Sequence, residues 1–175
     1  MALVVRTLRP FVVIGIAAAC VAATRLAWAV WGPALLINTT ASEPVGVYWV
    51  KHRVSAEYTR GMRVTFPVPR VYQGLVVERG WLAPGVQLIK HIGALAGDRV
   101  CIDAARAAIN GAPVGPVLAN DSAGRPLPQV RGCLTVPPGY FLPLSTTIPN
   151  SFDGRYMGVQ PLSTIVGEVI PVWTF

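Results

Sequence analysis

The distribution of hydrophobic positions divides the chain near residue 33. Between Pro10 and Trp31 the only charged residue is Arg25, and a helix needs roughly 20 apolar residues to cross a bilayer core. This run therefore predicts one N-terminal transmembrane helix, in which Arg25 lies toward the far end and can extend to the headgroups. Arg6 and Arg9 precede the run, so the positive-inside rule places the N-terminus in the cytoplasm and the residues after the run outside it.

Two other interpretations of this segment compete with a membrane anchor. Ala27-Trp28-Ala29 has the small-x-small form of a signal-peptide cleavage site. Ala17-Ala18-Ala19-Cys20 has the form of a lipoprotein cleavage site, but apolar residues continue past Cys20, which argues against it. We favour a retained anchor over residues 1–33. An anchor and a cleaved signal segment both export residues 34–175.

Beyond residue 33 the apolar positions occur in short runs separated by Gly and Pro. Such runs, rich in Val, Ile and aromatic residues, are typical of strands, and Asn110-Gly111 is typical of a tight hairpin turn. We therefore expect residues 34–175 to form one mostly β domain of coiled antiparallel sheets. The expected strands cover residues 47–50, 64–66, 75–77, 86–92, 100–102 and 164–172.

Composition and charge narrow the classes of function. With 53% hydrophobic and 13% charged residues, the chain is too apolar to be intrinsically disordered. The net charge is +7, but the basic residues are scattered and do not alternate with aromatic residues, which argues against nucleic-acid binding. The charge instead favours solubility and attraction to anionic lipid headgroups. No metal site is expected, because only two His and no Cys-x-x-Cys are present.

The cysteines are consistent with export. Cys20 lies within the N-terminal apolar run, whereas Cys101 and Cys133 lie beyond it. An oxidising compartment would allow these two to pair, and the alternative is a pair of buried free thiols. Given the expected topology, we favour a Cys101–Cys133 disulfide.

Lys90 lies in an apolar setting, Val86 to Ile92, and is one of only two lysines. Burial depresses the pKa of a lysine because it penalises the charged form. A general base near neutrality needs a pKa roughly 3 units below about 10.4, which corresponds to about 4 kcal/mol. The adjacent His91 would face the other side of a strand. The alternative, which composition alone favours, is a lysine whose stem lies on the sheet while its head reaches water.

The segment from Asn38 to Tyr48 resembles the nucleophile motif of the signal peptidase I family. Its Ser-x-Pro-x-Gly-x-Tyr form, beginning at Ser42, resembles the branch of conjugative transfer signal peptidases, the TraF type. Residues 61–66 are similar to the following family strand, with Met62 in place of the more usual Asp. An oxyanion hole is implied at the backbone N–H of Ser42 and the hydroxyl of Thr40. The alternative for Thr40 is ordinary turn or strand chemistry.

Two further segments continue the resemblance in family order. Residues 90–98 resemble the motif that holds the catalytic lysine, and residues 150–158 resemble the last motif, with Gly154 in place of a serine. The resemblance implies that Lys90 is the general base for Ser42 and that Ser151 hydrogen-bonds and orients Lys90. It also implies a supporting ion pair between Asp153 and Arg155, for which an ordinary surface salt bridge worth ~0–1 kcal/mol is the alternative. Ile89 and the apolar residues near Ser42 are expected to line a shallow pocket for small side chains.

The resemblance implies a signal peptidase fold and a membrane-anchored serine endopeptidase that needs no cofactor. Its expected substrate is an exported precursor, a conjugative pilin, cut at the outer face of a bacterial inner membrane with the catalytic domain in the periplasm. Membrane lipid is the other expected partner. Transpeptidation that joins the pilin ends is a further possibility. The alternatives are a housekeeping type I signal peptidase, a self-cleaving repressor, which the N-terminal segment argues against, and a non-catalytic envelope scaffold domain.

Overall fold

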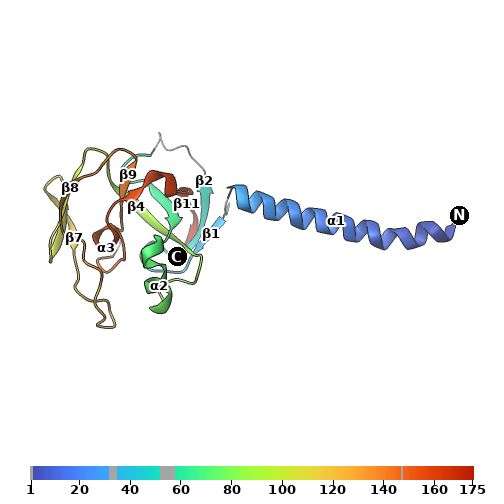
Figure 1. Cartoon of the computed structure of the whole chain (residues 1–175), viewed down its shortest axis with the longest axis horizontal. Coiled ribbons are helices and arrows are strands. Elements are labelled where there is room, and N and C mark those ends of the chain that lie inside the picture. Colours follow the sequence, from blue (N-terminus) through green and yellow to red (C-terminus); the bar gives the residue numbers. More distant parts are fainter. Residues whose placement is uncertain (1, 32–34, 52–57, 147) are drawn as a thin grey trace. The chain divides into compact units, whose positions relative to one another are not determined.

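The computed structural model describes residues 2–31, 35–51, 58–146 and 148–175 (Figure 1). The chain forms two units, Met1–Ala34 and Leu35–Phe175, which are described separately.

The N-terminal unit contains one helix, α1 (Ala2–Trp31). Residues 12–27, whose side chains are described, are all exposed. No helix among the described residues is both long and apolar enough to cross a membrane. The predicted helix is therefore present, whereas its predicted transmembrane span is not supported. The side chains of Arg6 and Arg9, on which the predicted orientation rests, lie outside the described residues.

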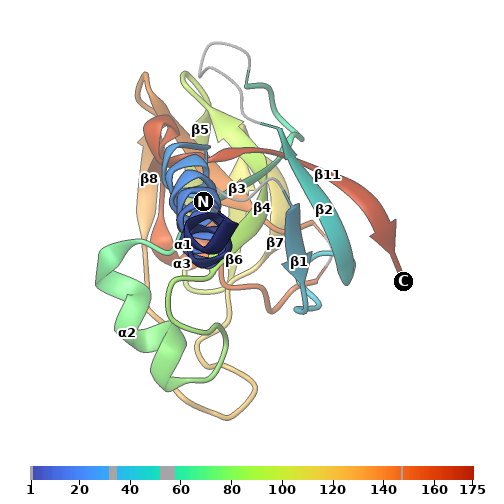
Figure 2. The same cartoon turned by 90° about the vertical axis from the view of Figure 1, so that its right-hand side faces the viewer.

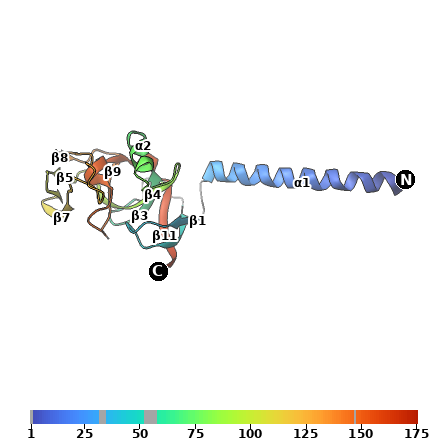
Figure 3. The ribbon, with the colours of Figure 1, turned by 90° about the horizontal axis from the view of Figure 1, so that it is seen from below.

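The second unit is mostly β, as predicted, and its named strands pair in an antiparallel manner. A seven-stranded sheet has the order β1-β2-β11-β3-β4-β9-β10, and a four-stranded sheet has the order β7-β6-β5-β8. In Figure 3 the smaller sheet lies at one end of this unit, and β1 and β11 lie at the other. The strands are β1 (Leu35–Asn38), β2 (Gly46–Lys51), β3 (Arg63–Pro67), β4 (Gln87–Leu95), β5 (Arg99–Ile102), β6 (Arg106–Ile109), β7 (Ala112–Pro116), β8 (Gly132–Thr135), β9 (Tyr140–Leu144), β10 (Gln160–Pro161) and β11 (Gly167–Thr174).

Among the described residues of this unit there are also three short helices, α2 (Arg70–Glu78), α3 (Gly154–Met157) and the 3₁₀ helix η2 (Leu162–Thr164). Figure 2 shows α2 to one side of the large sheet. The prediction of a strand at residues 75–77 was wrong, because these residues lie in α2. The short apolar run is typical of a strand when it is considered alone. In the structure, Tyr72 and Val76 are four residues apart and therefore lie on the same face of a helix. Both pack in the core that contains Phe66 and Phe141.

The core explains why β4 has an apolar sequence. Leu88, Ile89 and Lys90 are consecutive and all buried, so both faces of this central strand are covered. One cluster packs Leu88 and Ile92 with Phe66 and Phe141. A strand buried on both faces loses the apolar–polar alternation of an exposed sheet. Lys90 is therefore placed in the interior by the strand that carries it.

The smaller sheet confirms two local predictions. Asn110 and Gly111 join β6 to β7 with φ values of 52° and 82°, as a tight hairpin turn requires. Cys101 on β5 and Cys133 on β8 are register partners and form a disulfide. The predicted pairing of these cysteines is therefore present.

Candidate functional site

Ser42 lies in the loop between β1 and β2, and Asn38 at the end of β1 shapes this loop. The Asn38 Nδ2 group donates to the carbonyl oxygens of Thr40, Glu43 and Pro44 at 2.9–3.0 Å. Its Oδ1 accepts from the Thr40 backbone N–H at 3.1 Å. A single buried amide thus hydrogen-bonds three carbonyl groups and one N–H of the loop. Asn38 was part of the predicted motif, but sequence reasoning gave it no role.

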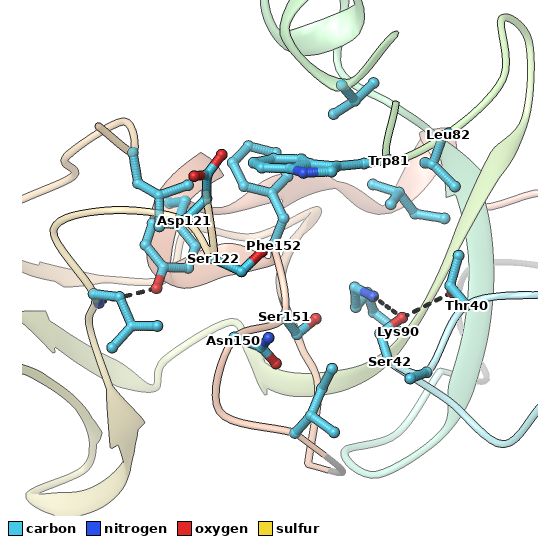
Figure 4. A pocket seen from close by; sticks show the side chains of 17 residues that line it. Thr40, Ser42, Trp81, Leu82, Lys90, Asp121, Ser122, Asn150, Ser151 and Phe152 are labelled. Atoms are coloured by element: carbon cyan, nitrogen blue, oxygen red, sulfur yellow. Dashed lines mark hydrogen bonds between the residues drawn. The ribbon is translucent and has the colours of Figure 1, made fainter. Parts of the chain in front are cut away.

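Lys90 reaches Ser42 from β4. Its Nζ donates to Ser42 Oγ at 2.9 Å (Figure 4), and the residue is 2% exposed. Burial lowers the pKa of Lys90 from 10.5 to about 8, although the charges of Asp153 and Glu43 raise it; Arg155 lowers it further. When the amine is neutral it has a lone pair, so the same contact can run from the Ser42 hydroxyl to Nζ. The structure therefore brings together the two residues on which the sequence prediction centred.

A series of polar contacts connects the backbone carbonyl of Ser42 to the buried residues Asp153 and Arg155. Ser145, which sequence reasoning missed, donates from Oγ to the Ser42 carbonyl at 2.8 Å and from its backbone N–H to Asp153 Oδ2 at 2.9 Å. Asp153 accepts two further bonds of 2.9 Å from Nε and Nη2 of Arg155. Asp153 and Arg155 are 0% and 1% exposed. The predicted ion pair is thus present and lies in the interior rather than on the surface.

For Thr40 and Ser151, the observed hydrogen bonds differ from those that the predicted roles require. The Thr40 hydroxyl lies 3.3 Å from Ser42 Oγ, but it donates to Asn38 Oδ1 at 2.9 Å. An oxyanion role would require this hydroxyl to rotate. Ser151 Oγ is buried and has no hydrogen-bond partner among the described residues, so the predicted bond from Ser151 to Lys90 is not formed. Ser151 nonetheless lines the same pocket as Lys90 and Ser42 (Figure 4).

A buried carboxylate next to Ser42 was not predicted. Glu43 is 1% exposed, and its Oε2 accepts from Arg63 Nε at 2.8 Å. Its Oε1 lies 3.1 Å from Nδ1 of His91. His91 therefore faces Glu43 while Lys90 contacts Ser42, consistent with the expectation that only one of these neighbours would face the serine. No motif signals this cluster, because its members are far apart in the sequence.

The Ser42–Lys90 pair lies in a cavity of about 260 Å³. Its walls are largely apolar, and Trp81 and Phe152 lie 5.4 Å apart on one side, by ring centroids. Ile89, which was expected to line this pocket, does not do so but packs against Tyr48 and Val169. The lining residues are Thr40, Ala41, Ser42, Val76, Trp81, Leu82, Leu88, Lys90, Leu118, Asp121, Ser122, Leu127, Ile148, Asn150, Ser151, Phe152 and Tyr156.

Comparison with known proteins identifies the family. The model of the family described as signal peptidase, peptidase S26, matches residues 7–174. The chain belongs to this signal peptidase family. The S26 match spans both units and includes Ser42, Lys90 and the polar residues that surround them.

Curated proteins and a solved structure are similar to this chain. The plasmid transfer protein TraF of Escherichia coli is 34% identical over 166 residues, which cover 88% of this chain and 91% of the relative. The conjugal transfer protein TraF of Agrobacterium fabrum (strain C58 / ATCC 33970) is 38% identical over 151 residues, covering 79% and 82%. A crystal structure of a signal peptidase I from Enterococcus faecalis V583 is 22% identical and covers 64% of this chain and 96% of its own, with a TM-score of 0.39.

Proposed function

We propose that Ser42 is the nucleophile and Lys90 the general base of this serine peptidase. The observation that carries the proposal is the 2.9 Å contact between Lys90 Nζ and Ser42 Oγ, made by a lysine that is almost fully buried. A pKa of about 8 gives the amine a substantial neutral fraction near neutrality, as a base requires. Arginine could not replace it, because a guanidinium stays protonated.

The geometry supports a two-step acyl transfer. The neutral Lys90 amine takes the proton of the Ser42 hydroxyl while Oγ bonds to the scissile carbonyl carbon. The resulting ammonium then passes its proton to the leaving amine, and the acyl-enzyme remains on Ser42. The backbone N–H of Ser42 and the Thr40 hydroxyl are the proposed donors to the oxyanion. Thr40 can donate there once its hydroxyl turns from Asn38.

Three variants test the pair directly. Ser42→Ala and Lys90→Ala should each abolish cleavage of a precursor by the full chain in detergent, and Lys90→Arg should be equally inactive. Circular dichroism and thermal unfolding should show that each variant folds. Cleavage at the wild-type rate by Ser42→Ala or by Lys90→Ala would refute the assignment. Failure of all three proteins and of the wild type to react with an acylating serine probe would favour a non-catalytic scaffold instead.

We propose as substrate the exported precursor of a conjugative pilin. The names of the relatives, a plasmid transfer and a conjugal transfer protein, support this choice over a housekeeping signal peptidase.

The acyl-enzyme could also be resolved by an amine, which would join the pilin ends. An N-terminal amine of the same pilin, held near the acyl-enzyme, would have a high effective concentration and could outcompete water. Intact mass separates the outcomes, because a cyclic product is one water lighter than the linear chain. Unchanged pilin processing after deletion of the gene would refute the substrate.

We propose that the protein is associated with the bacterial inner membrane, with the β unit in the periplasm. Support comes from apolar side chains on one face of β1, β2 and β11. Leu35, Trp49 and Ile170 are direct cross-strand neighbours, and each is exposed. The exposed apolar residues of α1 offer a second contact. Recovery of the protein in the soluble fraction, or resistance of its β unit to protease added to spheroplasts, would contradict this location.

A further inference from the structure

Two consecutive residues of the Ser42 loop contact two consecutive residues of β4. Ser42 Oγ accepts from Lys90 at 2.9 Å, and Glu43 Oε1 lies 3.1 Å from Nδ1 of His91. Arg63 on β3 is the register partner of His91 and donates from Nε to Glu43 Oε2 at 2.8 Å. Glu43 therefore joins the nucleophile's loop to the two adjacent strands that carry Lys90 and its neighbour.

The protonation of this cluster follows from its contacts. An ionised carboxylate attracts a protonated imidazole, so the 3.1 Å approach of His91 Nδ1 to Oε1 is a favourable charged contact when His91 is protonated, although neither atom makes a hydrogen bond to the described residues in this geometry. Burial alone would raise the pKa of Glu43, but its close contacts with His91 and Arg63, together with their charges, bring this pKa below its ordinary value. Glu43 is thus an ionised group whose Oε2 is hydrogen-bonded to Arg63, whose Oε1 lies beside His91, and whose side chain is shielded from water.

We propose that Glu43 is a positioning residue: held by Arg63 and His91, its carboxylate fixes the loop so that Ser42 Oγ stays in contact with Lys90 Nζ. This inference rests on the proposed Ser42–Lys90 chemistry. Asn38 closes the loop internally, and Ser145 holds the Ser42 carbonyl. The Asn38 and Ser145 contacts do not involve β3 or β4. The Glu43 contacts connect the loop directly to these two strands.

Two features separate this role from substrate binding and from simple bracing. Glu43 does not line the cavity described above, so its loss should act on the position of Ser42 rather than on substrate contacts. Its negative charge also raises the pKa of Lys90, as does that of Asp153, whereas burial and Arg155 lower it. A neutral residue at position 43 should therefore lower the pKa of Lys90, which an uncharged structural brace would not do.

The kinetic test uses Glu43→Gln and a matched pair at position 91. Misplacement by about 1 Å can cost roughly 100-fold in rate, and we expect Glu43→Gln to lower kcat by about tenfold or more while KM stays within about twofold. His91→Ala, which removes the group beside Glu43 Oε1, should lower kcat similarly. His91→Asn should restore most of that loss, because an asparagine amide N–H can donate to Oε1 of Glu43, which is otherwise unbonded among the described residues. Asp103→Asn, which removes an exposed charge, should leave both constants unchanged.

The second test observes Lys90 itself. Lys51 and Lys90 are the only lysines, so the full chain labelled with ¹⁵N-lysine in detergent gives two side-chain signals, with exposed Lys51 as the internal reference. The Lys90 signal should titrate at lower pH in Glu43→Gln than in the wild type. The acid limb of kcat/KM should move in the same direction, since only the neutral amine is a base.

The outcomes distinguish the inference from the proposed function. Wild-type kcat and unchanged Lys90 titration in Glu43→Gln would overturn the inference. Equal losses of kcat in His91→Ala and His91→Asn would also overturn it, and this pair decides if Glu43→Gln does not fold. If the wild type shows no Ser42-dependent cleavage, the proposed function fails, and the inference fails with it. An unchanged Lys90 titration would then show in addition that the Glu43 charge does not act on Lys90.

Discussion

At Lys90 the fold buries an amine that water would keep protonated. Its pKa falls from 10.5 to about 8 chiefly through burial, so the folded chain releases this proton more readily than the unfolded chain does. Each pKa unit corresponds to about 1.36 kcal/mol, which puts the cost of burying the protonated form at roughly 3 kcal/mol. This cost accompanies the lowered pKa that a general base needs, and it makes the free energy of unfolding depend on pH.

The direction of this dependence follows from proton linkage. Between about pH 8 and pH 10.5 the unfolded chain binds more protons at this position than the folded chain, so stability rises with pH across this window. Below pH 8 both forms are protonated and the cost is complete. We expect Lys90→Met to be more stable than the wild type by about 3 kcal/mol near pH 7, with the gap narrowing toward pH 10.5. Urea unfolding across this range measures it, with exposed Lys51→Met as control; a gap independent of pH would contradict the expectation.

Thr40 offers a second test at the residue scale. Removing one donor to a developing oxyanion typically costs about 2.7–4 kcal/mol, or 10²–10³ in kcat. Thr40→Val keeps the shape and removes the hydroxyl, so it should lower kcat by roughly this factor with little change in KM. Thr40→Ser should retain most of the activity. A Thr40→Val enzyme with wild-type kcat would mean that the bond to Asn38 is the hydroxyl's whole role.

At the scale of elements, the disulfide joins β5 to β8 within the smaller sheet, away from the residues that surround Ser42. Its two cysteines are separated by 32 positions, and closing a loop of that length in the unfolded chain is worth roughly 4 kcal/mol in the chain-entropy account. The disulfide should therefore support stability without entering the chemistry.

We expect Cys101→Ser combined with Cys133→Ser to lower the free energy of unfolding by up to roughly 4 kcal/mol. The specific activity of the folded fraction should stay near that of the wild type, because neither cysteine lines the cavity beside Ser42. Urea unfolding and active-site titration measure the two quantities. Loss of activity in protein shown to be folded would instead couple the smaller sheet to the site.

At the scale of the whole β unit, the cavity is assembled from separate parts of the chain. Residues 40–42 come from the β1–β2 loop, Trp81 and Leu82 follow α2, and Leu118 to Leu127 follow β7. Asp121, at the end away from Ser42 in Figure 4, is paired with Arg79 and Arg125. An apolar cavity of about 150 Å³ can hold a benzene molecule, so 260 Å³ accommodates a sizeable apolar side chain.

Trp81→Ala should therefore weaken the binding of peptides that place an apolar side chain in this cavity. We expect a rise in KM with a smaller change in kcat, since the contact is made equally in the ground and transition states. Val71→Ala, at an exposed position on α2, is the matched control. Steady-state kinetics on a peptide series with small and large apolar residues measures the effect, and equal KM values for wild type and Trp81→Ala across the series would refute it.

The sequence predicted the mostly β class, the disulfide and the proximity of Ser42 and Lys90, because strand patterns and family motifs are local features. It did not predict the roles of Glu43, Asn38 or Ser145. Glu43 meets Arg63 at a separation of 20 positions, and such pairings depend on sheet register rather than on a nearby pattern. The strand expected at residues 75–77 failed for a related reason: packing against Phe66 and Phe141 selected a helix. The predicted pocket was shallow, whereas the cavity has an additional wall formed by residues 118–127, which follow β7. No local pattern places this segment beside Ser42.

The distances in sequence between the site residues have a consequence for the order of folding. Ser42 and Lys90 are 48 positions apart, and Ser42 and Ser145 are 103 apart. Contacts at such separations form late, because the chain must close long loops before it gains from them. On refolding from urea, we expect the far-UV dichroism to recover before peptidase activity; simultaneous recovery would contradict this. A chain that has not yet finished folding would then be unable to cleave its neighbours or itself.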